Sequence, residues 1–279
     1  MLTLGVAVVL LLLVYWQILY YMVLHWQQVP DYNHGFLVAP LAVYFAYERK
    51  RKLRRIPIQG SWLGLIPLSV GLASLAVGRL GVELTTMRSG FVFTLIGLVL
   101  LLLGKRMFRA LAFPLLFLFL MVPLPQSLVN VIAFPLQLIA ASTAVSAMQM
   151  SGIPVLLEGN IIHLAHTDLF VEQACSGLRS LTSLITIGVI FAYFFRKTIG
   201  ERVILVASTI PIAIVVNSFR VALTGALAHY FGKEAATGAI HELEGLFTFV
   251  LALMLLFVEA HLLSLVWVRL PDRVREALT

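Results

Sequence analysis

The sequence has 279 residues, of which 61% are hydrophobic and 12% are charged, and its formal net charge is +7. Soluble domains are on average about half apolar and about a quarter charged, so this composition excludes an ordinary soluble protein. Apolar runs recur along the chain, and about 20 apolar residues suffice for an α-helix to cross a bilayer. The composition therefore predicts an all-α polytopic integral membrane protein surrounded by membrane lipids.

The positive charge is concentrated in four short segments between apolar runs. Fifteen of the 20 lysines and arginines lie in residues 49–55, 105–109, 196–202 and 269–275. Basic residues in short loops mark the cytoplasmic side of a membrane, so both termini are predicted to be cytoplasmic. The same placement argues against nucleic-acid binding, because no basic face is interleaved with exposed aromatic side chains.

The apolar runs predict about eight transmembrane helices. The first covers residues 4–24 and ends in an aromatic belt of Tyr20, Tyr21 and Trp26. It lacks the basic start and the cleavage site of a signal peptide, so we expect it to be retained. The other predicted helices cover residues 36–47, 60–80, 91–104, 111–124, 176–195, 203–227 and 241–268.

One further apolar stretch, residues 127–150, does not fit the crossing pattern. From Arg109 on the cytoplasmic side to the polar region before Cys175 on the outer side, the chain must cross an odd number of times. Only residues 111–124 and 127–150 are available, and the second stretch carries Asn130, Gln137 and several hydroxyl side chains. We therefore predict that residues 127–150 form an interfacial or re-entrant helix, or one packed inside the bundle.

Residues 151–172 form the longest predicted external segment. Two β-rich pieces flank Glu158-Gly159-Asn160, a turn sequence, which favours a short hairpin. The segment leads directly to Cys175. Because no internal repeat or soluble linker interrupts the chain, residues 1–279 are expected to form a single membrane-embedded domain.

Cys175 is the only cysteine of the chain and precedes a long apolar run. A buried lone cysteine commonly behaves as an inert small hydrophobe. Here it lies at a predicted loop-to-helix junction, followed by Ser176 and by Gly177, which permits close approach. Arg179, one helical turn further, and the start of the helix would both favour a thiolate, while Glu172 could pair with a nearby arginine.

Arg220 lies inside an apolar run, where a charge is costly unless it is paired or hydrated. Asn217 precedes it by three residues, so both side chains can lie on one helix face. Arg220 could snorkel outward or form a structural ion pair. It could also be the intramembrane substrate site of a transporter or of a lipid-linked saccharide carrier.

His241-Glu242 begins the last apolar run, on the same predicted outer side. The topology thus brings Cys175, Arg220 and His241 to one membrane face on three different helices. A thiol beside a histidine base is an arrangement that nucleophilic catalysis uses. The alternative is that His241, like the external His34, is a solvated helix cap.

The sequence predicts neither a metal nor an organic cofactor. A single cysteine excludes a multi-cysteine metal site. His241-Glu242 also lacks the second histidine, four residues after the first, that a zinc-binding helix of the metalloprotease type carries.

Three separated motifs resemble the exosortase/archaeosortase family, and histidine rather than arginine in the third motif favours its bacterial exosortases. The resemblance covers nearly the whole chain in order, and proteins of this family have about eight spans. The three motifs are Glu172-Gln173-Ala174-Cys175-Ser176-Gly177-Leu178-Arg179-Ser180, Asn217-Ser218-Phe219-Arg220-Val221 and His241-Glu242-Leu243-Glu244-Gly245, with weaker matches at Asn33-His34-Gly35, Val122-Pro123-Leu124-Pro125 and Leu157-Glu158-Gly159-Asn160.

The resemblance implies a membrane cysteine transpeptidase or protease of the bacterial inner membrane, with an active site that faces the periplasm. Its partners would be exported proteins that end in a short Pro-Glu-Pro-type motif, one transmembrane helix and a basic tail. Cys175 would attack the scissile carbonyl and form an acyl-thioester. Water, an amine, or a lipid- or saccharide-linked acceptor would then resolve that intermediate.

The resemblance and elementary chemistry assign the other roles differently. By resemblance, Arg220 occupies the proton-donor position and His241 stabilises the transition state. An arginine with a pKa above about 12 is a poor proton shuttle. Chemistry therefore favours Arg220 for carboxylate or oxyanion recognition and His241 as acid and base. The predicted supporting residues are Glu172, Ser176, Gly177, Arg179, Asn217, Glu242 and His34.

Two other classes of function compete with the enzyme. A transporter or lipid-linked saccharide carrier explains the intramembrane Arg220, but it gives no reason for a cysteine and a histidine at the same face. A structural assembly subunit leaves all three residues unexplained.

Overall fold

The computed structural model describes residues 2–165, 167–171, 177–196, 198–232 and 238–269. The chain divides into two compact units, residues 1–126 (unit 1) and 127–279 (unit 2). Each unit has its own buried core and is described by itself. That the two units act as the single domain 1–279 stays a prediction.

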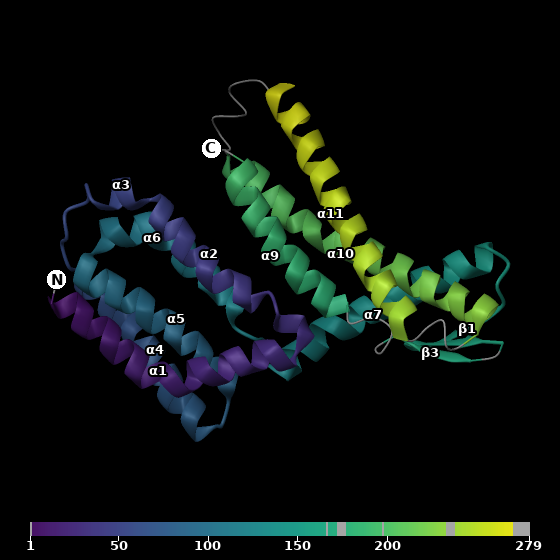
Figure 1. The fold of residues 1–279 in the computed structure, drawn as a ribbon, viewed down its shortest axis with the longest axis horizontal. Helices are drawn as coiled ribbons and strands as arrows, with labels where there is room; N and C mark the ends of the chain where they lie inside the picture. The colour runs from purple at the N-terminus through teal and green to yellow at the C-terminus, as the bar shows by residue number, and fades with distance from the viewer. Residues whose placement is uncertain (1, 166, 172–176, 197, 233–237, 270–279) are drawn as a thin grey trace. The chain divides into compact units, whose positions relative to one another are not determined.

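Unit 1 is helical throughout its regular structure (Figure 1). Its longest helix, α1, packs against α5, and α4 and α5 form a closely packed antiparallel pair. The basic run after residue 48 follows α2 and includes the short helix α3. In chain order the elements are α1 (Leu2–Gln28), η1 (Pro30–Tyr32), α2 (Gly35–Glu48), α3 (Lys50–Leu53), η2 (Trp62–Gly64), α4 (Leu65–Leu80), α5 (Leu84–Leu98), η3 (Val99–Leu103), α6 (Lys105–Phe117) and η4 (Leu118–Met121).

The core of unit 1 combines close helix packing with a buried hydrogen bond between α1 and α5. Tyr15 of α1 is fully buried, and its hydroxyl lies 2.8 Å from Thr94 Oγ1 and 3.2 Å from the Gly71 carbonyl oxygen. Gly71 is required at this crossing, because a Cβ there would lie 2.6 Å from the backbone nitrogen of Thr94. Small residues that allow backbones to approach are typical of helix pairs in membranes.

Helix α5 begins earlier than the sequence predicts. The apolar run predicts a helix over residues 91–104, which would leave Arg88 before its start, but the helix begins at Leu84. The reason is local, since the Glu83 carboxylate accepts hydrogen bonds from the backbone N–H groups of Thr85 and Thr86 and caps the helix. Arg88 is consequently inside α5 and is buried.

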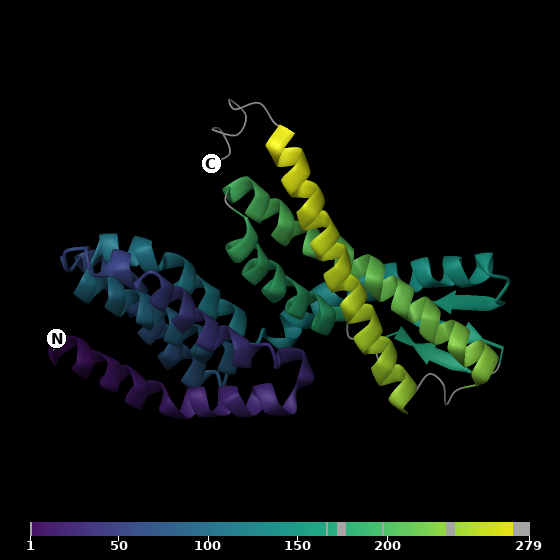
Figure 2. The same ribbon diagram turned by 45° about the horizontal axis from the view of Figure 1, so that its top comes forward.

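Unit 2 combines four long helices with a small sheet. Helices α9 and α11 each pack against α10, and the sheet lies beside the C-terminal halves of α7 and α10 (Figures 1 and 2). Its elements are α7 (Gln126–Met150), β1 (Val155–Glu158), β2 (Ile161–Leu164), β3 (Asp168–Phe170), α9 (Gly177–Phe195), α10 (Ile199–Phe231) and α11 (Gly238–Arg269).

The predicted external hairpin is confirmed. Strands β1 and β2 pair antiparallel around Glu158-Gly159-Asn160, with Glu158 opposite Ile161 and Val155 opposite Leu164. Gly159 has a φ of 61°, a conformation that glycine adopts without strain. A third strand, β3, pairs antiparallel with β2 and was not predicted.

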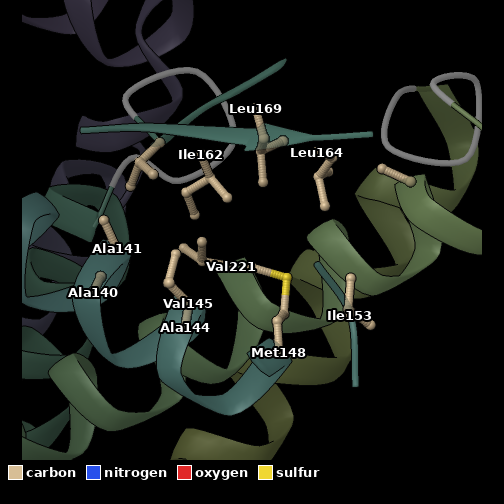
Figure 3. Close-up of a cluster of buried hydrophobic side chains, with 12 residues drawn as sticks. Ala140, Ala141, Ala144, Val145, Met148, Ile153, Ile162, Leu164, Leu169 and Val221 are labelled. Atoms are coloured by element: carbon tan, nitrogen blue, oxygen red, sulfur yellow. The ribbon is translucent and has the colours of Figure 1, made fainter. Parts of the chain in front are cut away.

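The sheet packs on α7 and α10 through one buried apolar cluster (Figure 3). Small residues of α7 bring that helix close to the sheet, whose buried face presents Ile162, Leu164 and Leu169. Val221 of α10 also lies in the cluster. The sheet therefore packs directly on α10 at Val221, the residue that follows Arg220 in the sequence.

Helix α10 carries two cores along its length. Its first half packs with α9 and α11 through Leu205, Ala213 and Val216, and its second half packs with the sheet through Val221 and Ala228. With 33 residues it is about 50 Å long at 1.5 Å per residue, which exceeds the roughly 30 Å of a bilayer core. It begins at Ile199 with a capping box and ends at Phe231, beyond the predicted boundaries 203–227.

The all-α polytopic membrane class is confirmed. Six helical stretches of the described residues are long and apolar enough to cross a membrane. The count of eight stays a prediction, because α2, the α6–η4 stretch and α9 are shorter or less apolar than these six. Residues 126–150 belong to the six by length and composition, so their interfacial or re-entrant placement also stays a prediction.

Among the described side chains of the sheet, His163 is the titratable group whose pKa is shifted. The carboxylate of Asp168, directly opposite on β3, lies 2.7 Å from its Nδ1 atom and raises the pKa of His163. Glu158, with an oxygen 3.4 Å from Nε2, acts in the same direction. Protonated His163 of β2 therefore forms ion pairs with Glu158 of β1 and with Asp168 of β3.

We expect the sheet to be more resistant to opening at pH 6 than at pH 8.5. A raised folded-state pKa contributes stability fully below the unfolded value of about 6.5 and loses it as the pH rises through the folded value. Hydrogen exchange of the β2 and β3 amides, corrected for the intrinsic rate at each pH, measures this difference. His163→Gln should remove it, and an unchanged difference in that variant would show that another group is responsible.

Candidate active site

The proposed nucleophile lies in a segment for which the structure gives only the flanks. Cys175, Glu172 and Ser176 lie outside the described residues. Before them, Val171 follows β3, and its backbone N–H donates a hydrogen bond to the Asn160 carbonyl oxygen at 3.1 Å. After them, Gly177 begins α9. In the sequence, Cys175 thus lies between the sheet and α9, and the placement of this junction outside the membrane stays a prediction.

For three other predicted residues the structure describes the backbone only. Arg179 lies in the first turn of α9, and His241 and Glu242 lie in the first turn of α11. Their side chains are outside the described part of the structure. Both helices pack in the three-helix core with α10, so the starts of α9 and α11 belong to one compact unit.

Arg220 and Asn217 are brought together on α10, as predicted. Asn217 is buried and Arg220 is half-buried. Both line a cavity of about 10 Å³, room for roughly one water molecule, together with Leu184 of α9 and Thr248 of α11. The predicted pair therefore lies where α9, α10 and α11 meet.

The Arg220 guanidinium lies directly against α11 at Gly245. A Cβ added at Gly245 would lie 3.3 Å from Nη2 and 3.5 Å from Cζ of Arg220. Gly245 follows His241 by four residues, so the two positions lie one helical turn apart on the same face of α11. The missing side chain at residue 245 thus lets a cation approach the helix turn next to His241.

A buried acid near this contact was not singled out from the sequence. Glu244 is 5% exposed, and the Thr224 hydroxyl of α10 lies 2.8 Å from its Oε2 atom and 2.9 Å from the Arg220 carbonyl oxygen. Thr248, also buried, bonds back to the Glu244 carbonyl oxygen. The signal available in the sequence was an acid within the last apolar run, where ionisable groups need partners.

His34 is placed in unit 1 and makes a contact there. Its Nε2 atom lies 3.1 Å from the Leu120 carbonyl oxygen, so the ring donates to that carbonyl and connects the start of α2 to η4. Unit 2 contains Arg220, Asn217 and Glu244. A supporting role of His34 in the chemistry stays a prediction.

The arrangement at the meeting of α9, α10 and α11 suits recognition of an anion or of a developing negative charge. A guanidinium offers five fixed N–H donors, and its value for an oxyanion rises where water is excluded. Among the described side chains, no group of three or more histidine, cysteine, aspartate or glutamate residues is positioned to hold a metal ion.

Comparison with known proteins identifies one family. A family model described as transmembrane exosortase matches residues 26–258, which include all three motifs singled out above. No curated protein and no solved structure gives a significant match to the chain.

Proposed function

The chain belongs to the transmembrane exosortase family, and we propose that it is a cysteine transpeptidase or protease that removes the C-terminal sorting signal of exported proteins. Family membership supports a membrane sorting transpeptidase in general. The signal that we propose is a Pro-Glu-Pro-type motif followed by one transmembrane helix and a basic tail. The proposed active site faces the periplasm from the inner membrane, and both termini are cytoplasmic.

The proposed reaction proceeds through Cys175. Its thiolate attacks the scissile carbonyl carbon and forms a tetrahedral oxyanion. Collapse of this species breaks the peptide C–N bond, and the departing amine takes up a proton from His241, which recovers one from the water or amine that attacks next. The exported protein is then held as an acyl-thioester on the sulfur. Attack by water or by an amine at the same carbonyl breaks the C–S bond and regenerates the thiolate.

One observation supports the division of labour around this cysteine: the Arg220 guanidinium contacts α11 one helical turn from His241. The forked N–H donors of the Arg220 guanidinium are suited to stabilise the oxyanion or a substrate carboxylate. His241 can exchange protons near neutral pH and is therefore the acid and base. Asn217, buried beside Arg220, supports the guanidinium face of the site.

The remaining predicted residues have supporting roles in this proposal. Arg179 favours the thiolate form of Cys175, since it follows by one helical turn. Gly177 and Ser176 form the entry into α9, Glu172 pairs with a cation of the site, and Glu242 orients His241. Glu244 joins this set because it is buried and bonded to Thr224 of α10, which fixes α11 against α10 beside Arg220.

A reporter protein tests the proposed function. An exported, N-terminally tagged protein that ends in the motif, an apolar helix and a basic tail is expressed in cells with and without this chain. We expect a shortened product in the membrane fraction, identified by intact mass, only when the chain is present. A reporter with the motif replaced by alanines is the control and should stay full length. Full-length reporter in both strains would reject the proposal.

A further inference from the structure

The strand that leads to Cys175 has an open edge. In the three-stranded sheet the order is β1-β2-β3, so β3 is an edge strand. The Leu164 N–H bonds to Thr167 and the Val171 N–H bonds to Asn160, which fixes the phase of the β2–β3 ladder. Hydrogen-bonded pairs alternate along an antiparallel ladder. The N–H and C=O groups of Asp168 and Phe170 therefore point away from β2.

These outward groups have no hydrogen bond to any other described residue. The opposite edge of the sheet differs, because the Gln149 side chain of α7 donates to the Val155 carbonyl oxygen of β1 at 3.3 Å. An edge with unpaired N–H and C=O groups is a template for another extended chain. The outward N–H and C=O groups thus belong to β3, the strand that precedes the proposed nucleophile in the sequence.

We propose that an extended segment of the substrate polypeptide binds as a fourth strand on the outer edge of β3. This inference rests on the proposed function and names how the substrate is held. Strand addition uses main-chain hydrogen bonds for affinity and alternate side chains for selection. It suits an enzyme that acts on many exported proteins, because the paired groups are common to every peptide.

Distance along the chain supports this occupant. Cys175 follows Phe170 by five positions in the sequence, and five residues can span at most about 18 Å when fully extended. A peptide paired with Asp168 and Phe170 is therefore within a few residues of the proposed thiol. Phe170 is 45% exposed, so its ring can cover a side chain of the added strand.

A pocket at the same end of the sheet offers a place for the peptide beyond Phe170. It has a volume of about 540 Å³, and Asn160, the partner of Val171, is one of its lining residues. The first half of α7 supplies the rest, with apolar side chains beside the amides of Asn130 and Gln137. Such a surface suits an extended peptide with both polar and apolar side chains, because the amides can bond to polar groups and the apolar side chains can cover the rest.

A single proline substitution in β3 tests whether the outward N–H of the edge strand holds the substrate. Phe170→Pro removes the outward N–H and leaves the ladder to β2, whereas Phe170→Ala removes the ring alone and is the matched control. We expect tail removal from the reporter to be about fivefold slower in Phe170→Pro than in Phe170→Ala, the factor that one lost hydrogen bond produces. Equal rates in the two variants would overturn the inference.

Disulfide trapping tests binding without catalysis. Cys175→Ala gives a chain free of cysteine, into which Phe170→Cys is introduced against single cysteines placed along the reporter before its apolar helix. Pairing on β3 predicts cross-links at every second reporter position. Cross-links that recur every three to four reporter positions would overturn the inference, because they indicate a helix. So would the absence of any cross-link, or cross-links between two copies of this chain without reporter. If wild-type chain leaves the reporter intact, the proposed function fails, and trapping still reports on the edge.

Discussion

Cys175→Ala is expected to abolish removal of the C-terminal tail from an exported reporter, while the variant still accumulates in the membrane. Removing the nucleophile of an enzyme that uses covalent catalysis costs on the order of 10⁴-fold or more in rate. The chain has no other cysteine that could substitute. Full-length precursor measured by intact mass, at wild-type levels of the chain, is the expected result. Normal processing in this variant would reject cysteine chemistry.

A matched substitution and a chemical trap sharpen this experiment. Ser142→Ala also removes one heteroatom from a small side chain, but Ser142 is exposed and its hydroxyl donates to the Ile139 carbonyl oxygen of its own helix. Processing should be unchanged in that control. In the wild type, hydroxylamine should release the reporter as a hydroxamate, because it attacks thioesters. No hydroxamate with otherwise normal cleavage would argue against an acyl-thioester.

Local signals in the sequence were sufficient for much of the architecture. The β1–β2 hairpin was predictable because Glu158-Gly159-Asn160 determines the turn by itself. Strand β3 was not, because Asp168–Phe170 is too short to show alternation and becomes a strand only by pairing with β2. The start of α5 was missed for a similar reason: its cap is a single carboxylate, Glu83, and not an apolar pattern.

The candidate site, too, was only partly predictable from the sequence. Arg220 could be singled out from the sequence because a cation within an apolar run is costly unless it is paired or hydrated. Its neighbours were not, because contacts of Thr224 with Glu244, and of Arg220 with Gly245, depend on the rotation of α10 against α11. Sequence spacing relates residues of one helix and leaves the facing residue of the next helix undetermined.

The proposed separation of roles between Arg220 and His241 can be tested. The Arg220 guanidinium lies beside Gly245 of α11, where an added Cβ would lie 3.3 Å from its Nη2 atom. A proton donor in that position would need a group that titrates near neutral pH, which a guanidinium does not. Recognition of an oxyanion or carboxylate needs instead a fixed, forked cation, which a guanidinium provides.

Arg220→Lys is therefore expected to lose most of the processing activity although it keeps the positive charge. Removing one oxyanion donor costs about 10² to 10³ in rate, and we expect Arg220→Ala to show at least this loss and Arg220→Lys a large part of it. The matched control is Arg202→Lys near the opposite end of α10, where the Arg202 guanidinium donates to the Arg196 carbonyl oxygen. Initial rates of tail removal, normalised to the amount of chain in the membrane, measure the effect. Full activity in Arg220→Lys would remove the support for forked recognition, because an ammonium supplies charge without that geometry.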